Sequence, residues 1–405
     1  MKPIVRAGRM KPVHSDIRGP LFVEAMKRQK QGIDILKLNT GNPATFGFGL
    51  PDSIKNALME HMQDGVGYCD FKGMPQARQA ICDYETSKGI KGITPDDVFI
   101  GNGVSEVVSF ALTPLLNDGD EVLVPSPSYS LWGNSVYLED GKPVFYTCDE
   151  QANWYPDIQD IRSKITDKTK AIVIINPNNP TGVLYPKELL LEIIQIAREF
   201  GLLIFADEIY DRLVMDGKQH ISLASLTEDV PVITLNGLSK SHCLCGYRCG
   251  WMVISGPREL TEDYRQGIIQ LTSLRLCANT MAQIVIPAAL DDMETPASMV
   301  RPGGRIYEQR EATVRELEKI NGLSFVKNDA AFYVFPKLDV KKFNITNDKQ
   351  FAHDLLDATN ILLVPGSGFD WKDPDHFRIV MLPQADILSD AIRRMGTFLD
   401  GYKQK

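Results

Sequence analysis

The sequence lacks several features that would assign it to a membrane or to nucleic acid. No run reaches the roughly 18 consecutive apolar residues of a membrane-spanning helix. Segment 1–11 carries basic residues but no apolar stretch after them, which argues against a secretory signal. Acidic residues outnumber basic residues by 52 to 44, whereas a sequence-independent nucleic-acid binder is usually basic. We therefore expect a cytoplasmic protein that binds neither a membrane nor nucleic acid.

Cysteine is sparse, with seven residues scattered over a chain of 405. An odd, dispersed set suits free thiols in a reducing compartment better than a disulfide framework. Cys243, Cys245 and Cys249 lie close together beside His242, but their spacing matches no paired metal-ligand motif. We interpret these cysteines as small packing residues and expect no metal site.

Between about residues 98 and 254, short apolar runs alternate with longer amphipathic stretches. The runs are apolar throughout, which is typical of strands covered on both faces. This alternation predicts an α/β fold with a mostly parallel, doubly wound sheet of seven strands. Ligands of such sheets bind beyond the C-terminal ends of the strands. The predicted strands are 98–100, 121–124, 144–146, 171–175, 202–206, 232–235 and 251–254.

The pattern changes near residue 300, where segment 301–304 contains Pro302, Gly303 and Gly304. Beyond it, a charged helix is predicted over 305–320, followed by short strands and a second helix near 349–359. We expect three parts: an N-terminal arm (1–45) that packs on the small domain, a large cofactor-binding domain (46–300), and a small α+β C-terminal domain (301–405).

Lys240 follows the apolar run 230–235 and the chain-breaking Gly237. A lysine at the end of a buried strand is poorly solvated, which lowers its pKa and favours the neutral amine. A neutral amine can form a Schiff base with an aldehyde. A solvated loop lysine is the alternative interpretation.

The segment 101–106 leads from a predicted strand into a helix predicted over 107–116. Gly103, Val104 and Ser105 could form a phosphate-binding cup there, because a helix N-terminus favours an anion. The dinucleotide-binding pattern fits poorly, since Glu106 stands where its third glycine belongs. A simple helix cap is the other possibility.

Two further strands end in polar side chains. The loop 176–182 contains two prolines and a glycine and can present Asn179 in a fixed direction. Asp207 follows the run 202–206, and a buried carboxylate needs a cation or a donor. Tyr210 is expected one helical turn later; a helix cap and a core tyrosine are the alternatives. Together with Lys240, these residues form the set that pyridoxal phosphate requires.

At these residues the chain resembles the class I and II aminotransferases, which are pyridoxal-phosphate enzymes of fold type I. The resemblance covers nearly the whole chain and extends to the bacterial alanine aminotransferases (glutamate–pyruvate transaminases). It is carried most clearly by segments 16–20, 38–43, 67–70 and 171–182.

The resemblance implies a role for each matching residue toward the cofactor. Lys240 forms the Schiff base and carries the proton, Asp207 pairs with the ring nitrogen, and Tyr129 stacks on the ring. Asn179 and Tyr210 donate to the phenolate oxygen. The phosphate is held by Gly103, Val104, Ser105, Ser239 and Arg248, and by Tyr68 of the neighbouring subunit in a homodimer with shared sites.

The resemblance also implies a substrate site in which Gly41, Asn179 and Arg378 bind the α-carboxylate. Arg18 and Arg275 are the candidates for binding a second, distal carboxylate. The family has cis peptide bonds before the prolines that match Pro127 and Pro180, and the same bonds are expected here.

The implied activity is a ping-pong transamination between L-alanine and 2-oxoglutarate, which forms pyruvate and L-glutamate. An aminotransferase of other donor specificity or a C–S β-lyase of the same fold is the alternative. A transcription regulator with an aminotransferase-like domain is a different class, but it needs an N-terminal DNA-binding unit, and here the motifs begin too early for one.

Overall fold

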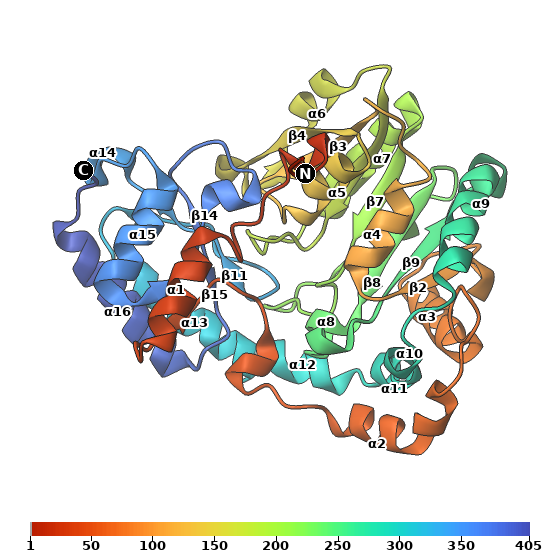
Figure 1. Cartoon of the computed structure of the whole chain (residues 1–405), viewed down its shortest axis with the longest axis horizontal. Coiled ribbons are helices and arrows are strands. Elements are labelled where there is room, and N and C mark those ends of the chain that lie inside the picture. Colours follow the sequence, from red (N-terminus) through yellow and green to blue (C-terminus); the bar gives the residue numbers. More distant parts are fainter. Residues whose placement is uncertain (1) are drawn as a thin grey trace.

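The computed structural model describes residues 2–405, and its largest element is an eight-stranded sheet (Figure 1). The strand order is β2-β9-β8-β7-β6-β3-β4-β5. The strands β4, β3, β6, β7 and β8 pair in parallel, whereas β9 is antiparallel to both of its neighbours. All seven predicted strands are confirmed, and a two-residue edge strand, β5, adds an eighth. The strands are β2 (Val98–Gly101), β3 (Glu121–Ser126), β4 (Lys142–Asp149), β5 (Tyr155–Pro156), β6 (Thr169–Ile175), β7 (Leu203–Asp207), β8 (Val232–Gly237) and β9 (Gly250–Ser255).

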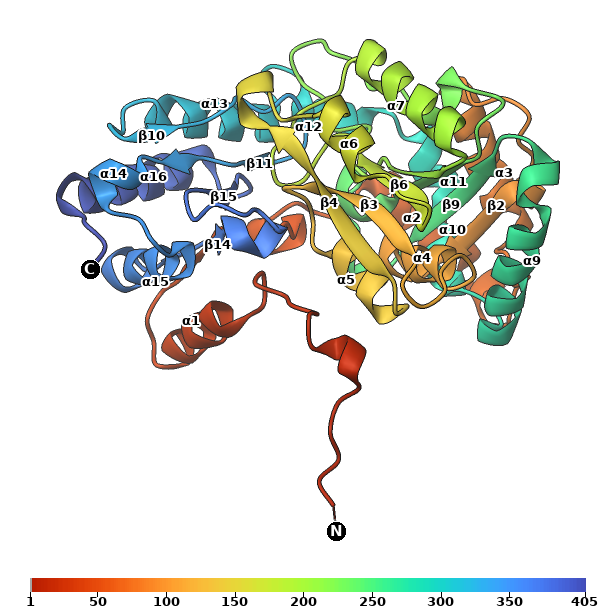
Figure 2. The same cartoon turned by 90° about the horizontal axis from the view of Figure 1, so that it is seen from above.

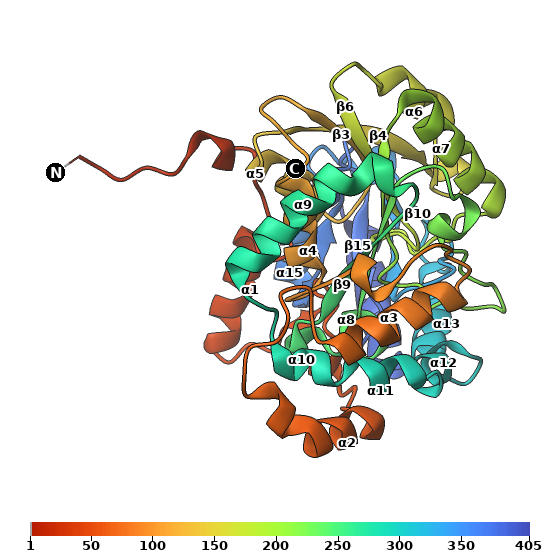
Figure 3. The ribbon, with the colours of Figure 1, turned by 90° about the vertical axis from the view of Figure 1, so that its right-hand side faces the viewer.

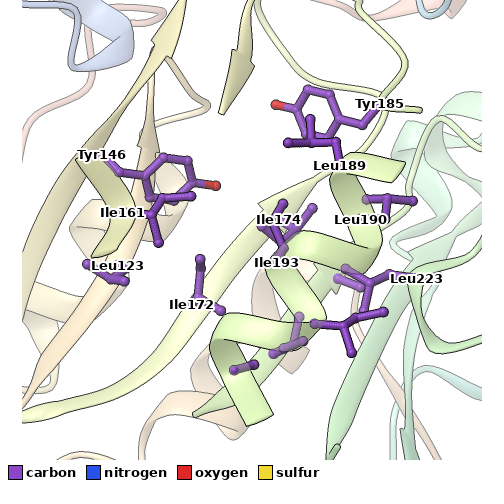
Figure 4. Packing of buried hydrophobic residues seen from close by; sticks show 14 of the residues in the cluster. Leu123, Tyr146, Ile161, Ile172, Ile174, Tyr185, Leu189, Leu190, Ile193 and Leu223 are labelled. Carbon is purple, nitrogen blue, oxygen red and sulfur yellow. The ribbon is translucent and has the colours of Figure 1, made fainter. Parts of the chain in front are cut away.

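Both faces of this sheet are buried, which explains why its strands are apolar throughout. Successive side chains of a strand point to opposite faces. In β6, Ile172 packs in one hydrophobic cluster and Val173 in another. On the first face, Ile193 of α7 (Lys187–Phe200) packs with Ile172 and Ile174 (Figure 4). On the second face, α4 (Val104–Leu112), α5 (Leu131–Leu138) and α9 (Arg258–Arg275) contribute to the cover.

The helix α7 shows how local sequence and packing agree. Its predicted range, 187–200, is the observed one. The apolar positions spaced three and four residues apart are buried, including Leu190, Ile193 and Ala197. The helix ends at Gly201, whose φ of +67° is the left-handed conformation that glycine adopts without strain.

A smaller unit is built from the C-terminal quarter and part of the N-terminal segment (Figures 1 and 2). Its three-stranded sheet has the order β11-β15-β14, and β1 pairs in parallel with β13. The predicted helix 305–320 is confirmed but ends at Leu317, and in the apolar run 332–335 only Tyr333 and Val334 form a strand. The elements are α1 (Pro20–Lys30), β1 (Leu36–Lys37), α13 (Arg305–Leu317), β10 (Leu323–Ser324), β11 (Tyr333–Val334), β12 (Lys337–Leu338), α14 (Val340–Phe343), α15 (Asp348–Thr359), β13 (Ile361–Leu362), β14 (Val364–Pro365), β15 (Phe377–Val380) and α16 (Ala385–Gly401).

The N-terminal segment runs along the molecule and then projects from it (Figures 2 and 3). Arg9 pairs with Asp140 beyond α5 at 2.9 Å, and His14 pairs with Asp370 at 3.0 Å. Ile4 and Val5, further out, are fully or largely exposed. The remaining helices are α2 (Asp52–His61), α3 (Pro75–Ser87), α6 (Ile158–Lys164), α8 (Leu238–Ser241), α10 (Thr280–Ile284), α11 (Ile286–Asp291) and α12 (Glu294–Val300).

The helices of the described chain bear on the membrane prediction. Within residues 2–405, no single helix is both long and apolar enough to cross a membrane. One combination, α9 with Thr280–Asp291, reaches the necessary length and composition, but it is bent by 119° at its break.

All seven cysteines are free thiols.

Candidate active site

The polar segments predicted to meet at one edge of the sheet do so. Tyr129 follows β3, Asn179 follows β6 and Asp207 ends β7. Lys240 lies in the short helix α8, directly after β8 and between the large sheet and the smaller unit (Figure 1). The parallel strands therefore bring these side chains to their common C-terminal edge, where ligands of such sheets bind.

Asp207 is 5% exposed, and its carboxylate accepts two hydrogen bonds. The Trp132 indole donates to Oδ2 at 3.1 Å, and the backbone N–H of Ile209 donates to Oδ1 at 3.4 Å. Burial raises the pKa of Asp207 to about 6, although the Trp132 hydrogen bond lowers it. Within residues 2–405, no side chain forms an ion pair with Asp207, so a buried anion faces the site and can accept a cationic ring nitrogen.

Tyr210 lies in a turn rather than in the predicted helix, because the chain folds back at Glu208, whose carbonyl accepts from Asp211 N. Its hydroxyl is 2.9 Å from that of Tyr333, and its side chain is buried. This position is compatible with the prediction of Tyr210 as a site residue, because its hydroxyl interacts electrostatically with Arg378 and Asp207.

The amine of Lys240 is hydrogen-bonded to the backbone. Its Nζ donates to the carbonyl of Gly41 at 2.9 Å and lies 4.0 Å from the Cys245 sulfur. The predicted lowering of the Lys240 pKa is wrong, because the net direction is upward. Burial does oppose the ammonium form, but attraction to the ionised forms of Tyr333 and Cys245 outweighs it and raises the pKa of Lys240.

The predicted phosphate cup lies where β2 turns into α4. The helix begins at Val104, three residues earlier than predicted, so Gly103 is its N-cap, with φ of +84°. A Cβ at Gly250 of β9 would lie 2.6 Å from the carbonyl carbon of Gly103 and closer still to the Val104 nitrogen. Glycine is needed at position 250 because the cup approaches β9 so closely.

Three further predicted residues surround this cup. Arg248 has a left-handed φ of +56° and donates from Nη1 to the Cys245 carbonyl at 3.0 Å. Its guanidinium also lies where a Cβ at Gly103 would be. Ser105 is exposed in the first turn of α4, and Ser239 is buried at the start of α8. Free helix N–H groups next to a guanidinium make this a site for a phosphate dianion.

Arg378 is a buried cation without an anionic partner in the described chain. It is 1% exposed, and Nη1 donates to the Asn179 side-chain oxygen at 2.9 Å. Its guanidinium stacks over Tyr333 and Phe369, 4.5 and 4.6 Å from the ring centroids. Its Nε has no hydrogen-bond partner, so the guanidinium can still bind a carboxylate.

Sequence reasoning missed two residues of this site, Tyr333 and Trp132. Tyr333 lies in the apolar run 332–335, and Trp132 lies in the apolar helix α5, so both read as core. The hydroxyl of Tyr333 contacts Tyr210, and a Cβ at Gly41 would clash with it. A signal existed for Trp132, since it comes one helical turn after Tyr129.

The two candidate residues for binding a distal carboxylate, Arg275 and Arg18, have different surroundings. Arg275 pairs with Glu106 at 2.5 Å and donates from Nη2 to the carbonyls of Phe71 and Ile100 at 3.2 Å, while its Nε has no hydrogen-bond partner. Both terminal nitrogens are thus engaged within the chain, which argues against Arg275 as a substrate ligand. Arg18 is exposed in the turn before α1, and within residues 2–405 it forms no ion pair.

One of the two predicted cis peptide bonds lies elsewhere in the structure. The cis bond predicted before Pro127 is confirmed, but the second precedes Pro177 instead of Pro180. The cis bond thus lies at the start of the loop 176–182, where the Asn176 side chain accepts a hydrogen bond from Tyr185 N at 2.9 Å. Tyr68 is 84% exposed in this single chain.

Two carboxylates and a histidine have the ligand types of a metal centre. One ligand atom each of Glu208, Asp211 and His220 lies within 4.8 Å of the others. However, Lys88 Nζ lies 2.7 Å from Glu208 and 3.1 Å from Asp211. Its ammonium thus occupies the place that a cation would take, and the group is a buried ion-pair network.

Comparison with known proteins identifies the family. The model of the aminotransferases of class I and II matches residues 33–392. The chain belongs to this family. It is 50% identical to the glutamate-pyruvate aminotransferase AlaA of Haemophilus influenzae over all of both chains.

Solved structures give the same result. An aminotransferase from Escherichia coli, 47% identical, superposes with a TM-score of 0.98 over all of both chains. The alanine aminotransferase of Pyrococcus furiosus, 41% identical, has a TM-score of 0.93 and covers 98% of this chain and 100% of its own. These matches confirm the predicted fold type I architecture.

Class I and II aminotransferases use pyridoxal phosphate, and the predicted cofactor is confirmed by family membership. The residues of this aminotransferase fit that group. Asp207 is a buried carboxylate that forms no ion pair within residues 2–405, and Gly250 leaves room for the backbone of the cup at Gly103. The Asn179 oxygen is taken by Arg378, which leaves the amide nitrogen free to donate to the phenolate oxygen.

Proposed function

We propose that this aminotransferase moves the amino group of L-alanine to 2-oxoglutarate and so forms pyruvate and L-glutamate. The observation that carries the proposal is the unpaired, buried Arg378 in the same site as Lys240 and Asp207. The names of the relatives, glutamate-pyruvate and alanine aminotransferase, support these substrates.

Each residue has a defined task in this reaction. Bound pyridoxal phosphate supplies an aldehyde for Lys240 and a protonated ring that takes up the electron pair left by the α-proton. The Lys240 amine removes that proton as the general base and later returns one. Arg378 fixes the α-carboxylate, which places the Cα hydrogen near the amine. Asp207 keeps the ring nitrogen protonated, because a buried negative charge favours a neighbouring positive one.

One site serves both half-reactions in turn. The amino acid and the oxo acid each carry an α-carboxylate for Arg378, so the second substrate binds after the first product has left. Gly41 contributes its carbonyl, which is 2.9 Å from Lys240 Nζ and orients the amine. The expected kinetics are therefore ping-pong.

Glutamate and 2-oxoglutarate carry a second carboxylate that alanine and pyruvate lack. We propose that Arg18, which is exposed and unpaired within residues 2–405, binds it. Arg18→Ala should then raise the KM for glutamate and 2-oxoglutarate while the KM for alanine stays near the wild-type value. An equal effect on both pairs would contradict this assignment.

A second copy of the chain is proposed to complete the site. Tyr68 is 84% exposed and Val66 is 76% exposed. Leu274, in the last turn of α9, is 82% exposed. Segments 65–68 and 277–280 line a cavity of about 570 Å³. Such exposed apolar residues are typical of an interface. Tyr68 would reach the phosphate of the partner's cofactor, and Tyr68→Phe should weaken pyridoxal phosphate binding in a dimer that sedimentation still detects.

The proposed location is the cytoplasm. All seven cysteines are free, including the half-buried Cys245 beside Lys240. Thiols persist in compartments that glutathione and thioredoxin keep reducing. Fractionation of cells that produce the protein at its natural level would test the location.

A half-reaction screen tests the proposed substrates. The holoenzyme is mixed with one amino acid at a time, and conversion of the cofactor to its amine form is followed by absorbance. Alanine and glutamate should convert it fastest, and Lys240→Ala should abolish multiple turnovers. Fast conversion only by other amino acids would overturn the donor assignment, and release of pyruvate and a thiol from a cysteine conjugate would indicate a β-lyase.

A further inference from the structure

We propose that Trp132 is a positioning residue that keeps the Asp207 carboxylate negatively charged and aimed at the ring nitrogen of the cofactor. The proposal rests on the role given to Asp207 above. Trp132 does not contact the reacting atoms; it acts through Asp207. Its indole N–H lies 3.1 Å from Asp207 Oδ2.

The geometry leaves this hydrogen bond without a competitor. Trp132 is 0% exposed and Asp207 is 5% exposed, so water does not compete for either group. The indole has one donor and no acceptor, and that donor is directed at the carboxylate. The backbone N–H of Ile209 is the other donor to Asp207, at a longer 3.4 Å. Trp132 therefore makes the shorter of the two hydrogen bonds to Asp207.

The indole itself cannot easily turn away. Its ring packs on Phe205, with centroids 5.3 Å apart, and Phe205 is two residues before Asp207 in β7. Its backbone N–H donates to the carbonyl of Tyr129 at 3.4 Å. One turn of chain thus carries both the ring predicted to stack on the cofactor and the donor that orients the carboxylate.

The electrostatic surroundings explain why a donor is needed here. The titratable groups that face Asp207 are Glu208, Lys240 and Tyr210. Burial raises the pKa of Asp207 most, the Trp132 hydrogen bond opposes it most strongly, and the neighbouring Glu208 raises it further. Without the indole donor, the carboxyl would be protonated nearer to neutral pH and would lose its attraction for a protonated ring.

Two changes at position 132 test the proposal in the full-length holoenzyme. Trp132→Phe removes the donor and part of the ring. Incorporation of 3-benzothienylalanine at the same position keeps the shape of tryptophan and replaces only the N–H by sulfur. We expect both variants to have a Kd for pyridoxal phosphate about tenfold higher at pH 7 than the wild type, and an acidic limb of kcat about one pH unit above the wild-type limb.

The matched control is Trp251→Phe. The indole of Trp251 donates to the buried Glu85 at 3.2 Å, away from Asp207, and the residue is 1% exposed. Its loss removes the same kind of hydrogen bond and should lower the melting temperature. The Kd for pyridoxal phosphate and the acidic limb should stay at their wild-type values.

The outcomes separate this inference from the proposed function. If the isosteric replacement leaves both the Kd and the acidic limb unchanged, Trp132 is only a packing residue. If it changes them no more than Trp251→Phe does, the effect is general destabilisation and the proposal is wrong. Asp207→Asn is measured in parallel, and wild-type values for that variant would instead overturn the role of Asp207 itself.

Discussion

The hydroxyl oxygens of Tyr210 and Tyr333 lie 2.9 Å apart, although 123 positions separate them in the chain. Burial raises the pKa of Tyr210 well above its usual range, so its hydroxyl stays a donor at all physiological pH values. The ring of Tyr333 also lies under the guanidinium of Arg378. One side chain thus connects Tyr210, which is predicted to donate to the cofactor, with Arg378, which is proposed to bind the substrate.

Replacing Tyr333 by Phe should separate these two contacts. The ring against Arg378 is kept, so the KM for alanine should change little. The hydroxyl partner of Tyr210 is lost, and kcat should fall by about three- to tenfold, the effect of one hydrogen bond. Steady-state kinetics with Tyr210→Phe and the double variant provide the check. A double variant that loses the full product of the two single effects would show that the hydroxyls act independently.

Replacing Arg378 by Lys should mainly impair substrate binding. Lysine keeps the charge but cannot form the bidentate, planar contact with a carboxylate. The KM for alanine should rise about tenfold or more, because a charge-assisted hydrogen bond is lost. Arg310→Lys is the control, since Arg310 is fully buried but already paired with Asp216 at 2.6 Å. An unchanged KM in Arg378→Lys would remove this residue from the substrate site.

Replacing Gly250 by Ala should damage the phosphate cup. The new Cβ would lie 2.6 Å from the Gly103 carbonyl carbon, so the start of α4 must shift. Overpacking of this kind costs about 1–3 kcal/mol, and pyridoxal phosphate should bind at least several-fold more weakly. Gly246→Ala is the matched control, because nothing lies within 4 Å of its Cβ position. Equal cofactor affinity in the two variants would contradict the close-approach argument.

The attachment of the N-terminal arm should depend on pH through His14. Its hydrogen bonds with Asp16 and Asp370 raise its pKa from 6.5 to about 9. A raised pKa in the folded state means that the stabilisation is fully present below pH 6.5 and is lost as the pH rises through about 9.

Limited proteolysis between pH 7 and 10 would measure this effect. Cleavage by trypsin after Arg9 should accelerate above pH 9 in the wild type, after correction with a peptide substrate; Lys11 is not a cleavage site because Pro12 follows it. His14→Gln cannot be protonated, so its cleavage rate should show no further change over that range. If the cleavage rate of the wild type changes with pH only as that of the peptide does, His14 does not attach the N-terminal arm.

Much of the fold was predictable because its signals are local. The seven apolar strands were recognised from their runs, and α7 from apolar spacing and the glycine that ends it. Helix boundaries were less certain where cap and ligand signals coincide. The helix α4 begins at Val104, since the same glycine that caps it also shapes the cup.

The direction of a pKa shift was not predictable for Lys240. Its position at a strand end implies burial, and burial alone lowers the pKa of an amine. The groups that reverse this, Tyr333 and Cys245, are brought to it by the fold. Arg275 is likewise engaged by a partner, Glu106, that lies 169 positions away in the chain.

The sequence by itself determined which segments are strands, where they end and which reactive side chains follow them, because these depend on neighbours within a few positions. Only the tertiary structure decided which of those side chains touch. Trp132 meets Asp207 across 75 positions and Arg378 meets Asn179 across 199. A hydrogen bond requires atoms about 3 Å apart, and only the packing of distant segments sets such a distance.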